Sequence, residues 1–167
     1  MDYRERRSSM IARLIFACVN FAARKGLADS RADDSAANSA KQLARRTGLR
    51  GETYAYWYLR RHGYVLVARN YTLPGIKGEI DMIGYDGPVL AFVEVKTRSA
   101  DEPDRPDPEQ AVNAEKRHHL ARVARQFLRS RRAESGSWRF DVIAIETRAG
   151  KRPEIRLHKG AFKPDSA

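Results

Sequence analysis

Two short charged segments on either side of one tight turn constrain this chain most. They are residues 78–81 (Gly-Glu-Ile-Asp) and 92–96 (Phe-Val-Glu-Val-Lys), and the pair Asp86-Gly87 between them is a strong β-hairpin signal. Each segment is apolar enough to be a strand, yet each carries charge where a buried strand would not. Buried charges cost several kcal/mol unless they are paired or bind a metal. The segments therefore predict a sheet with a polar site built into it.

The spacing of the charges predicts which of them share a face. Side chains alternate along a strand, so Glu79 and Asp81 share one face of the first strand, and Glu94 and Lys96 share one face of the next. A turn centred within the Asp-Gly pair places Glu79 opposite Glu94 and makes Asp81 a diagonal neighbour of Glu94, about 7–8 Å away. A shift of one residue would move the two carboxylates to opposite faces. The site therefore requires an even offset, which this turn favours.

Two carboxylates and a lysine on one face suggest metal-assisted phosphodiester chemistry. Asp81, Glu94 and the main-chain carbonyl of Val95 offer the oxygen ligands that magnesium or manganese prefers. Such an ion polarises a phosphate and lowers the pKa of an attacking water. Lys96 could stabilise the developing charge or orient that water. Glu52, on a helix before the sheet, could reach the cluster directly or through a bound water.

The same residues also allow a plainer interpretation. Glu94 and Lys96 could be a solvent-exposed edge pair, with Asp81 at the rim of the sheet and Glu52 lying along the surface. Lys116 could pack its aliphatic stem against the apolar face of a later helix. From the residues alone, both interpretations stay open.

Hydrophobic periodicity predicts two helices and five strands. The helices are residues 50–61 and 107–129, and the strands are residues 64–71, 78–85, 89–97, 138–146 and, more weakly, 155–159. Asp107 suits the N-cap of the second helix, Pro108 its first position, and Gln110 closes a capping box. Asp141 lies inside the fourth strand, as a structural or a supporting residue.

The order of these elements predicts the fold class. The first three strands form an antiparallel meander, and the second helix is a right-handed crossover to a fourth strand that lies parallel to the third. The expected architecture is α/β, an αβββαβ sandwich around a mixed sheet. With 167 residues, the chain has room for one such domain, expected over residues 47–160 with a tail at 161–167.

Residues 1–46 are expected to be a basic extension, largely disordered with a short helix. Residues 26–46 have few large apolar side chains and are typical of a linker. Residues 10–23 follow a basic stretch and resemble a signal peptide, but Arg13 and Asn20 interrupt the apolar run and favour an amphipathic extension. Translation from Met10 is a further alternative.

Composition sets limits on partners and compartment. The 32 basic and 21 acidic residues give a net charge of +11, which suits a polyanionic partner but is shared by other classes of protein. Cys18 is the one cysteine, so an internal disulfide is excluded and a reducing cytoplasm fits. No apolar run reaches the roughly 20 residues of a membrane-spanning helix.

The other motifs of the sequence say less about function. The basic side chains of the second helix and its end could face phosphates or solvent; they are Lys116, Arg117, Arg122, Arg125, Arg129, Arg131 and Arg132. His118 and His119 are adjacent, so on a helix they point about 100° apart and do not make the usual i, i+4 metal pair. The glycines do not fit a phosphate-binding loop.

Several of these motifs together resemble a known family. They are Gly51-Glu52, Ala55, Tyr58-Leu59, Gly63-Tyr64, Asn70-Tyr71, residues 78–83, residues 92–98, Lys116 and residues 139–142. In this order they are similar to the bacterial YraN-type proteins, a mostly uncharacterised family with a restriction-endonuclease-like fold of the PD-(D/E)XK nuclease superfamily, related to archaeal Holliday-junction resolvases. The resemblance covers about residues 47–146.

The resemblance implies a role for each residue of the site. Asp81 and Glu94 match metal ligands of the superfamily, Lys96 its catalytic lysine, and Glu52 the acid on its first helix. Ile80 stands where the name-giving pattern has proline. The residues expected to support the site are Glu79, Asp141 and Gln110, and those expected to contact nucleic acid are Lys116, Arg117, Arg122 and Arg98.

The implied function is a cytoplasmic, magnesium- or manganese-dependent endonuclease acting on DNA, branched or damaged DNA included. A homodimer is left open, and neither a membrane nor a small-molecule cofactor is expected. The alternative is a nucleic-acid-binding module that keeps the nuclease scaffold without catalysis.

Overall fold

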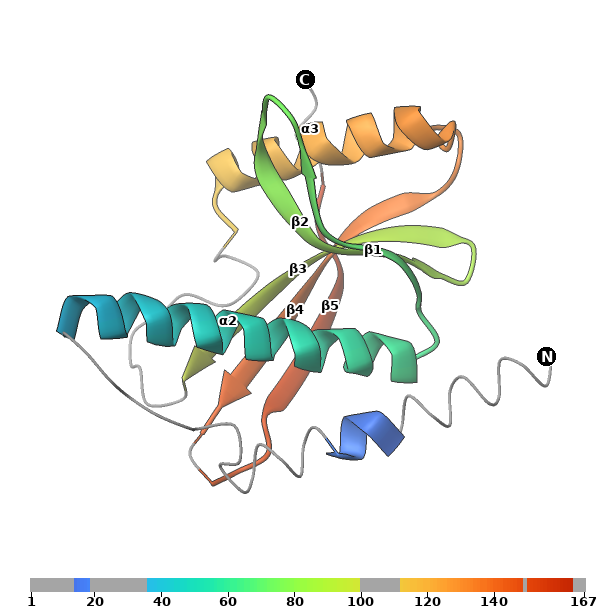
Figure 1. Cartoon of the computed structure of the whole chain (residues 1–167). Helices are drawn as coiled ribbons and strands as arrows, with labels where there is room; N and C mark the ends of the chain where they lie inside the picture. Colours follow the sequence, from blue (N-terminus) through green and yellow to red (C-terminus); the bar gives the residue numbers. More distant parts are fainter. Residues whose placement is uncertain (1–13, 19–35, 100–111, 149, 164–167) are drawn as a thin grey trace.

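The computed structural model describes residues 14–18, 36–99, 112–148 and 150–163, with the side chains of residues 36–46 and 49 outside that description. Its elements follow one another in the predicted order (Figure 1). They are α2 (Ala36–Arg61), β1 (Val65–Leu73), β2 (Ile76–Asp86), β3 (Val89–Ser99), α3 (Ala114–Arg131), β4 (Trp138–Thr147) and β5 (Glu154–Phe162). Residues 14–18 add a short helical turn. The fold is α/β, as predicted.

The five strands form one mixed sheet in the order β1-β2-β3-β4-β5. Strands β1, β2 and β3 are antiparallel neighbours, β3 and β4 are parallel, and β5 returns antiparallel to β4. Helix α3 connects the two parallel strands, as a crossover must. The predicted meander and the parallel pair are confirmed, and the arrangement is consistent with a restriction-endonuclease-like sandwich.

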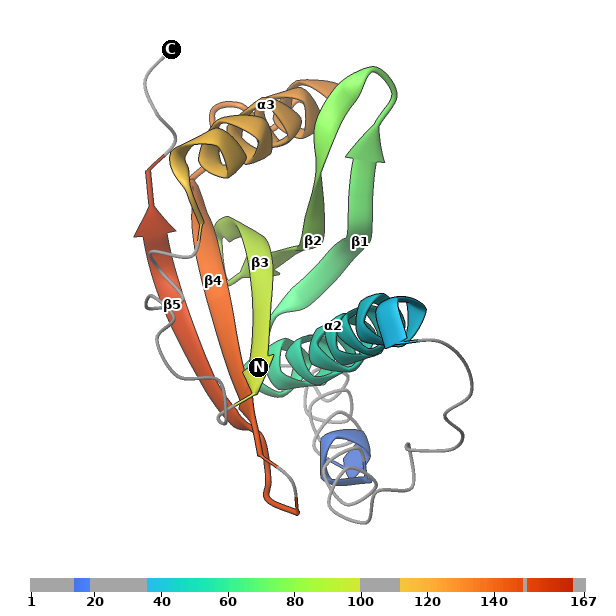
Figure 2. The same cartoon turned by 90° about the vertical axis from the view of Figure 1, so that its left-hand side faces the viewer.

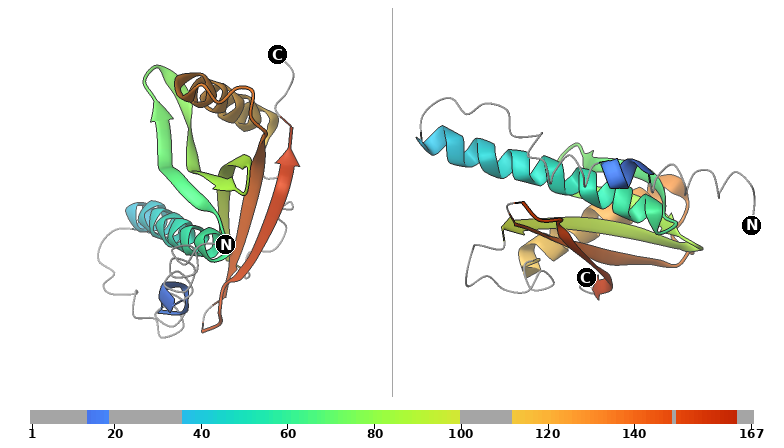
Figure 3. Two further views of the ribbon diagram at one scale, coloured as in Figure 1. Left: turned by 90° about the vertical axis from the view of Figure 1, so that its right-hand side faces the viewer. Right: turned by 90° about the horizontal axis from the view of Figure 1, so that it is seen from below.

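Helices α2 and α3 lie on opposite faces of the sheet (Figures 2 and 3), and an apolar core lies under each helix. Phe92 and Phe140 pack with Phe127 of α3, and Val93 and Ile143 pack with Leu59 of α2. Neighbouring residues of β3 thus enter different cores, because side chains alternate along a strand. Each helix covers its own core, so a side chain from β3 meets either α3 or α2.

The register between β2 and β3 differs by two residues from the prediction. Asp86 pairs with Val89 and Met82 with Val93. The predicted pairing of Glu79 with Glu94 is therefore wrong. Since the offset is even, Asp81 and Glu94 still share a face of the sheet, the one that carries α3.

Proline accounts for the altered register. The turn residues are Gly87 and Pro88 rather than Asp86 and Gly87. In the predicted register Pro88 would be a paired strand residue, but proline has no N–H to donate and holds φ at about −65°. Gly87 takes the first turn position with a φ of 59°. A positive φ at that position is what a tight hairpin needs.

Helix α2 is longer than predicted. It begins at Ala36 rather than at residue 50, so residues 36–46 of the expected linker are helical. This stretch has few large apolar side chains but many strong helix formers, alanine, lysine, arginine and glutamine among them. Of the rest of the expected extension, only residues 14–18 are described, and Phe16 there packs against Tyr58 with ring centroids 6.3 Å apart. No helix in the described ranges is long and apolar enough to span a membrane.

Helix α3 begins later than predicted. Its N-cap is Asn113, whose backbone is extended and whose side chain accepts a hydrogen bond of 2.9 Å from the backbone N–H of Lys116. Asparagine is among the best N-cap residues. The start predicted at Asp107 is therefore wrong, and the capping residues expected at 107–110 lie outside the described part of the chain.

A buried polar network ties strands together in the core beneath α2. Asp141, fully buried, accepts hydrogen bonds from Arg139 Nε at 2.8 Å, from the Gly160 N–H at 2.9 Å and from the Tyr64 hydroxyl at 3.1 Å. Arg139 also pairs with Asp86 at 2.6 Å. Three charged strand residues and the hydroxyl of Tyr64, just before β1, thereby satisfy one another, as a buried carboxylate requires.

Two glycines of α2 provide a matched test of how this helix packs on the sheet. A Cβ at Gly51 would lie 1.7 Å from Oγ1 and 2.9 Å from Cβ of Thr97 on β3, whereas a Cβ at Gly48 would meet no atom within 4 Å. We expect Gly51→Ala to lower the free energy of unfolding by about 1–3 kcal/mol. Gly48→Ala should raise it by up to about 1 kcal/mol through helix propensity. Urea unfolding measures both, and equal effects would contradict this packing.

Candidate metal centre

The site lies where β2 and β3 part. Their pairing ends at Met82 and Val93, one residue before Asp81 and Glu94. There the backbone N–H of Val95 donates a hydrogen bond of 2.6 Å to Oδ2 of Asp81. Beyond the last backbone pair of the two strands, a hydrogen bond to a side chain thus connects them and holds the carboxylate of Asp81 beside β3.

Glu94 is a buried carboxylate with one engaged and one unengaged oxygen. The residue is 3% exposed. Oε1 accepts from Nζ of Lys96 at 2.9 Å, and it also pairs with Nζ of Lys116 on α3. Oε2 is buried and has no hydrogen-bond partner among the described residues. A buried oxygen without a partner is costly, so Oε2 is a candidate ligand atom.

Burial and nearby charges shift the pKa values of Asp81 and Lys116. Burial raises the pKa of Asp81 to about 7, and the nearby charge of Glu94 adds to that rise, whereas the Val95 N–H and Lys116 oppose it. Burial acts to lower the pKa of Lys116, but its ion pair with Glu94 outweighs burial, and the pKa is raised. Asp81 has a second carboxylate nearby and little positive charge to compensate for it. Such an arrangement favours a proton or a cation bound at Asp81.

Glu52 approaches this pair from α2. Its negative charge contributes to the raised pKa of Asp81, and its Oε2 is buried without a hydrogen-bond partner in the described part of the chain. No group of three or more aspartate, glutamate, histidine or cysteine side chains among the described residues is placed to hold a metal together. The donors at hand are thus two carboxylates, with Glu52 more distant.

This donor set fits a hard, well-hydrated cation. Magnesium takes one or two carboxylates and keeps several waters, and the oxygens of Asp81 and Glu94 supply such a pair. Direct ligation by the Val95 carbonyl and by Glu52 remains a prediction. Manganese shares the preference for oxygen donors.

The residues predicted to contact nucleic acid differ in their contacts, and their role remains a prediction. Lys116 is turned to Glu94. Arg98 pairs with Glu146 at 3.3 Å, and Arg117 donates to the carbonyl of Val112 at 2.7 Å. Arg122 is exposed on α3.

The predicted supporting residues have different surroundings, and of those that the structure describes, Glu79 alone lines a groove with Asp81. Glu79 is exposed on β2. The contacts of Asp141 are with Arg139, Tyr64 and Gly160, away from Asp81 and Glu94. Gln110 lies outside the described residues.

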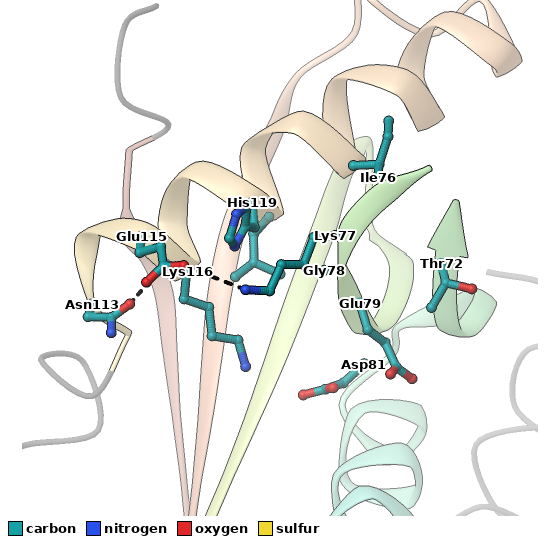
Figure 4. Close-up of a pocket in the computed structure, with 11 residues that line it drawn as sticks. Thr72, Ile76, Lys77, Gly78, Glu79, Asp81, Asn113, Glu115, Lys116 and His119 are labelled. Atoms are coloured by element: carbon teal, nitrogen blue, oxygen red, sulfur yellow. Dashed lines mark hydrogen bonds and ion pairs between the residues drawn. The ribbon is translucent and has the colours of Figure 1, made fainter. Parts of the chain in front are cut away.

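A groove leads away from Asp81 (Figure 4). One wall is the β1–β2 arm, the part of these two strands at residues 72–81, and the other is the first half of α3. Its lining consists of Thr72, Ile76, Lys77, Gly78, Glu79, Asp81, Asn113, Glu115, Lys116, His119 and Leu120. His119 was not predicted as a site residue, because its adjacency to His118 excludes the usual metal pair and indicates no other role. The signal that could have found it is its i, i+3 spacing from Lys116, which places both on one helix face.

The raised pKa of Asp81 predicts a pH-dependent stability of the metal-free protein. With a folded pKa of about 7 against an ordinary 3.8, the folded state holds the extra proton, so stability falls as pH rises between these values and is flat above. In EDTA at pH 8, Asp81→Asn should therefore unfold with a free energy more than about 1 kcal/mol above that of wild type.

The gap between Asp81→Asn and wild type should shrink toward pH 4. Urea unfolding across this range measures it, with Glu79→Gln as the control for loss of an exposed carboxylate from the same strand. Parallel pH profiles for Asp81→Asn and wild type would contradict the raised pKa.

Comparison with known proteins places the chain in a family. Residues 51–145 match the model of uncharacterised protein family UPF0102. A UPF0102 protein of Koribacter versatilis is 47% identical over 117 residues, 70% of this chain and 79% of that protein. Relatives in Solibacter usitatus (45% over 112 residues; 67% and 82%) and Symbiobacterium thermophilum (41% over 120 residues; 72% and 98%) carry the same family name. The chain therefore belongs to the UPF0102 family, the YraN-type proteins.

Proposed function

We propose that the protein is a metal-dependent DNA endonuclease of the PD-(D/E)XK superfamily that hydrolyses phosphodiester bonds. The observation that carries the proposal is the buried, unpartnered Oε2 of Glu94 beside the carboxylate of Asp81. Two carboxylates placed together at the end of a strand ladder are costly for the fold. A divalent cation would offset the negative charge of both carboxylates, and a site of this kind suits phosphoryl chemistry.

Each residue of the site has a distinct part in this function. Asp81 and Oε2 of Glu94 would hold the ion, which supplies Lewis-acid polarisation of the phosphate and a more acidic bound water. Lys96 is anchored 2.9 Å from Oε1 of Glu94, on the same face. From there its ammonium group can orient the attacking water or offset negative charge in the transition state. Lys116 balances the charge of Glu94 from α3.

DNA is the substrate that the charge of the chain favours. The net charge is +11, and four exposed arginines lie along α3 and at its end, Arg122, Arg129, Arg131 and Arg132. Contacts of this kind set affinity without reading sequence. Branched or damaged DNA in the cytoplasm is the specific form of substrate we propose, by analogy with the resolvases of the superfamily.

Cleavage assays with matched variants test the function. Duplex, single-stranded and four-way-junction DNA are incubated with wild type, Asp81→Asn and Glu94→Gln in magnesium or manganese. Each variant should reduce the cleavage rate by about 100-fold or more, since several kcal/mol of metal-derived stabilisation are lost. Glu154→Gln, an exposed position on β5, should cleave like wild type. Absence of cleavage by wild type on every substrate would contradict the proposal.

Metal binding has its own readout in thermal stability. A cation that binds only the folded state raises the melting temperature in proportion to the logarithm of its concentration. Magnesium should therefore raise the melting temperature of wild type and of Glu154→Gln, and leave those of Asp81→Asn and Glu94→Gln nearly unchanged. Equal shifts in all four proteins would place the ion elsewhere.

A non-catalytic nucleic-acid-binding module is the second candidate. The observation that favours it is that two lysines already pair with Oε1 of Glu94. The charge of Glu94 is therefore partly compensated without a metal. This function predicts salt-dependent DNA binding that Lys96→Ala leaves unchanged, and no cleavage in either metal. Binding measured at two salt concentrations beside the cleavage assay separates the two candidates.

A further inference from the structure

His119 occupies a defined place in the groove that leads from Asp81. It lies on α3, three residues after Lys116, and is half-buried among the groove residues (Figure 4). Its neighbour His118 is exposed and is not part of the lining. Two adjacent histidines therefore have different surroundings, and only one of them faces the groove.

Close packing against β2 holds His119 in position. Gly78 has a φ of 122°, and a Cβ at this residue would lie 3.2 Å from Cβ of His119. That φ is in a region which favours glycine, and the approach is tighter than a side chain would ordinarily allow. Strand β2 and helix α3 are thus in close contact at this point, so the Cβ atom that carries the imidazole is fixed in position.

The ring nitrogens of His119 have no hydrogen-bond partner in the described part of the chain. Within the described residues, the imidazole makes no hydrogen bond or ion pair, and its ring contact is with His118 at 6.4 Å between centroids. The other nitrogen-bearing side chains of the groove are engaged. Lys116 pairs with Glu94, Lys77 with Glu115 at 3.8 Å, and Asn113 caps α3.

The surrounding charges restrict what the imidazole could bind. Glu79, Asp81 and Glu115 line the groove, so an anion is tolerated only where a donor or a cation faces it. His119 is such a donor on the α3 wall. It lies about 4.5 Å further along the helix axis than Lys116, which borders the metal site. A strand that places one phosphate at Asp81 and Glu94 can thus present another to His119.

We propose that His119 donates a hydrogen bond to a phosphate of a nucleic-acid strand lying in this groove, next to the phosphate at the metal site. The inference rests on the proposed function and adds a substrate-binding residue to it. It also gives the nucleic-acid strand a path, which runs from Lys116 along α3, between that helix and the β1–β2 arm.

Equilibrium binding without metal tests the inference. Fluorescently labelled single-stranded and junction DNA are titrated in EDTA with wild type, His119→Leu, His119→Gln and His118→Leu. Leucine keeps the packing against Gly78 and removes both ring nitrogens, whereas glutamine retains a donor. His119→Leu should weaken binding about tenfold, the usual loss for a hydrogen bond to a charged group. His119→Gln should recover most of it, and His118→Leu should bind like wild type.

The outcomes separate this inference from the proposed function. Equal affinity of His119→Leu and wild type, or equal losses in the Leu and Gln variants at unchanged melting temperature, would overturn the role of His119 even if the protein cleaves DNA. Weaker binding by His119→Leu together with no cleavage by wild type would overturn the nuclease function and keep the phosphate contact. Wild type that binds neither DNA would overturn the inference. If His119→Leu does not fold, His119→Met replaces it.

Discussion

The buried charge of Glu94 is the constraint on which the rest of the site depends. A carboxylate that is 3% exposed on a central strand is tolerated only with compensation. The compensation comes from two elements, Lys96 on the same strand and Lys116 on α3. Removing either lysine would leave part of a buried charge uncompensated. The ion pairs therefore fix the first turn of α3 over β3, and with it one wall of the groove.

Asp81 and Glu94 meet the same burial in different ways. Glu94 has two ammonium groups on one oxygen, whereas Asp81 has a backbone N–H and a pKa raised to about 7. Pairs of carboxylates whose environments differ in this way are typical of sites that use protons or metals. In the function we propose, a divalent cation replaces the proton of Asp81, so metal affinity should weaken below neutral pH.

Alternation and hydrophobic runs were enough to predict the sheet, because they depend on neighbours in the sequence. They placed Asp81 and Glu94 on one face and gave the strand order correctly up to β4. Errors arose where two local signals competed. Pro88 moved the turn by two positions, and Asn113 displaced the cap predicted at Asp107.

The groove could not be predicted, because it depends on contacts between distant elements. Gly78 and His119 are about forty residues apart in the sequence, and only the packing of α3 on β2 brings them together. The same holds for Glu52, whose place follows from Gly51. Gly51 lies against Thr97 of β3, and the charge of the next residue of α2 contributes to the raised pKa of Asp81. Besides burial, acids from two different elements therefore raise the pKa of Asp81, Glu94 from the neighbouring strand β3 and Glu52 from α2.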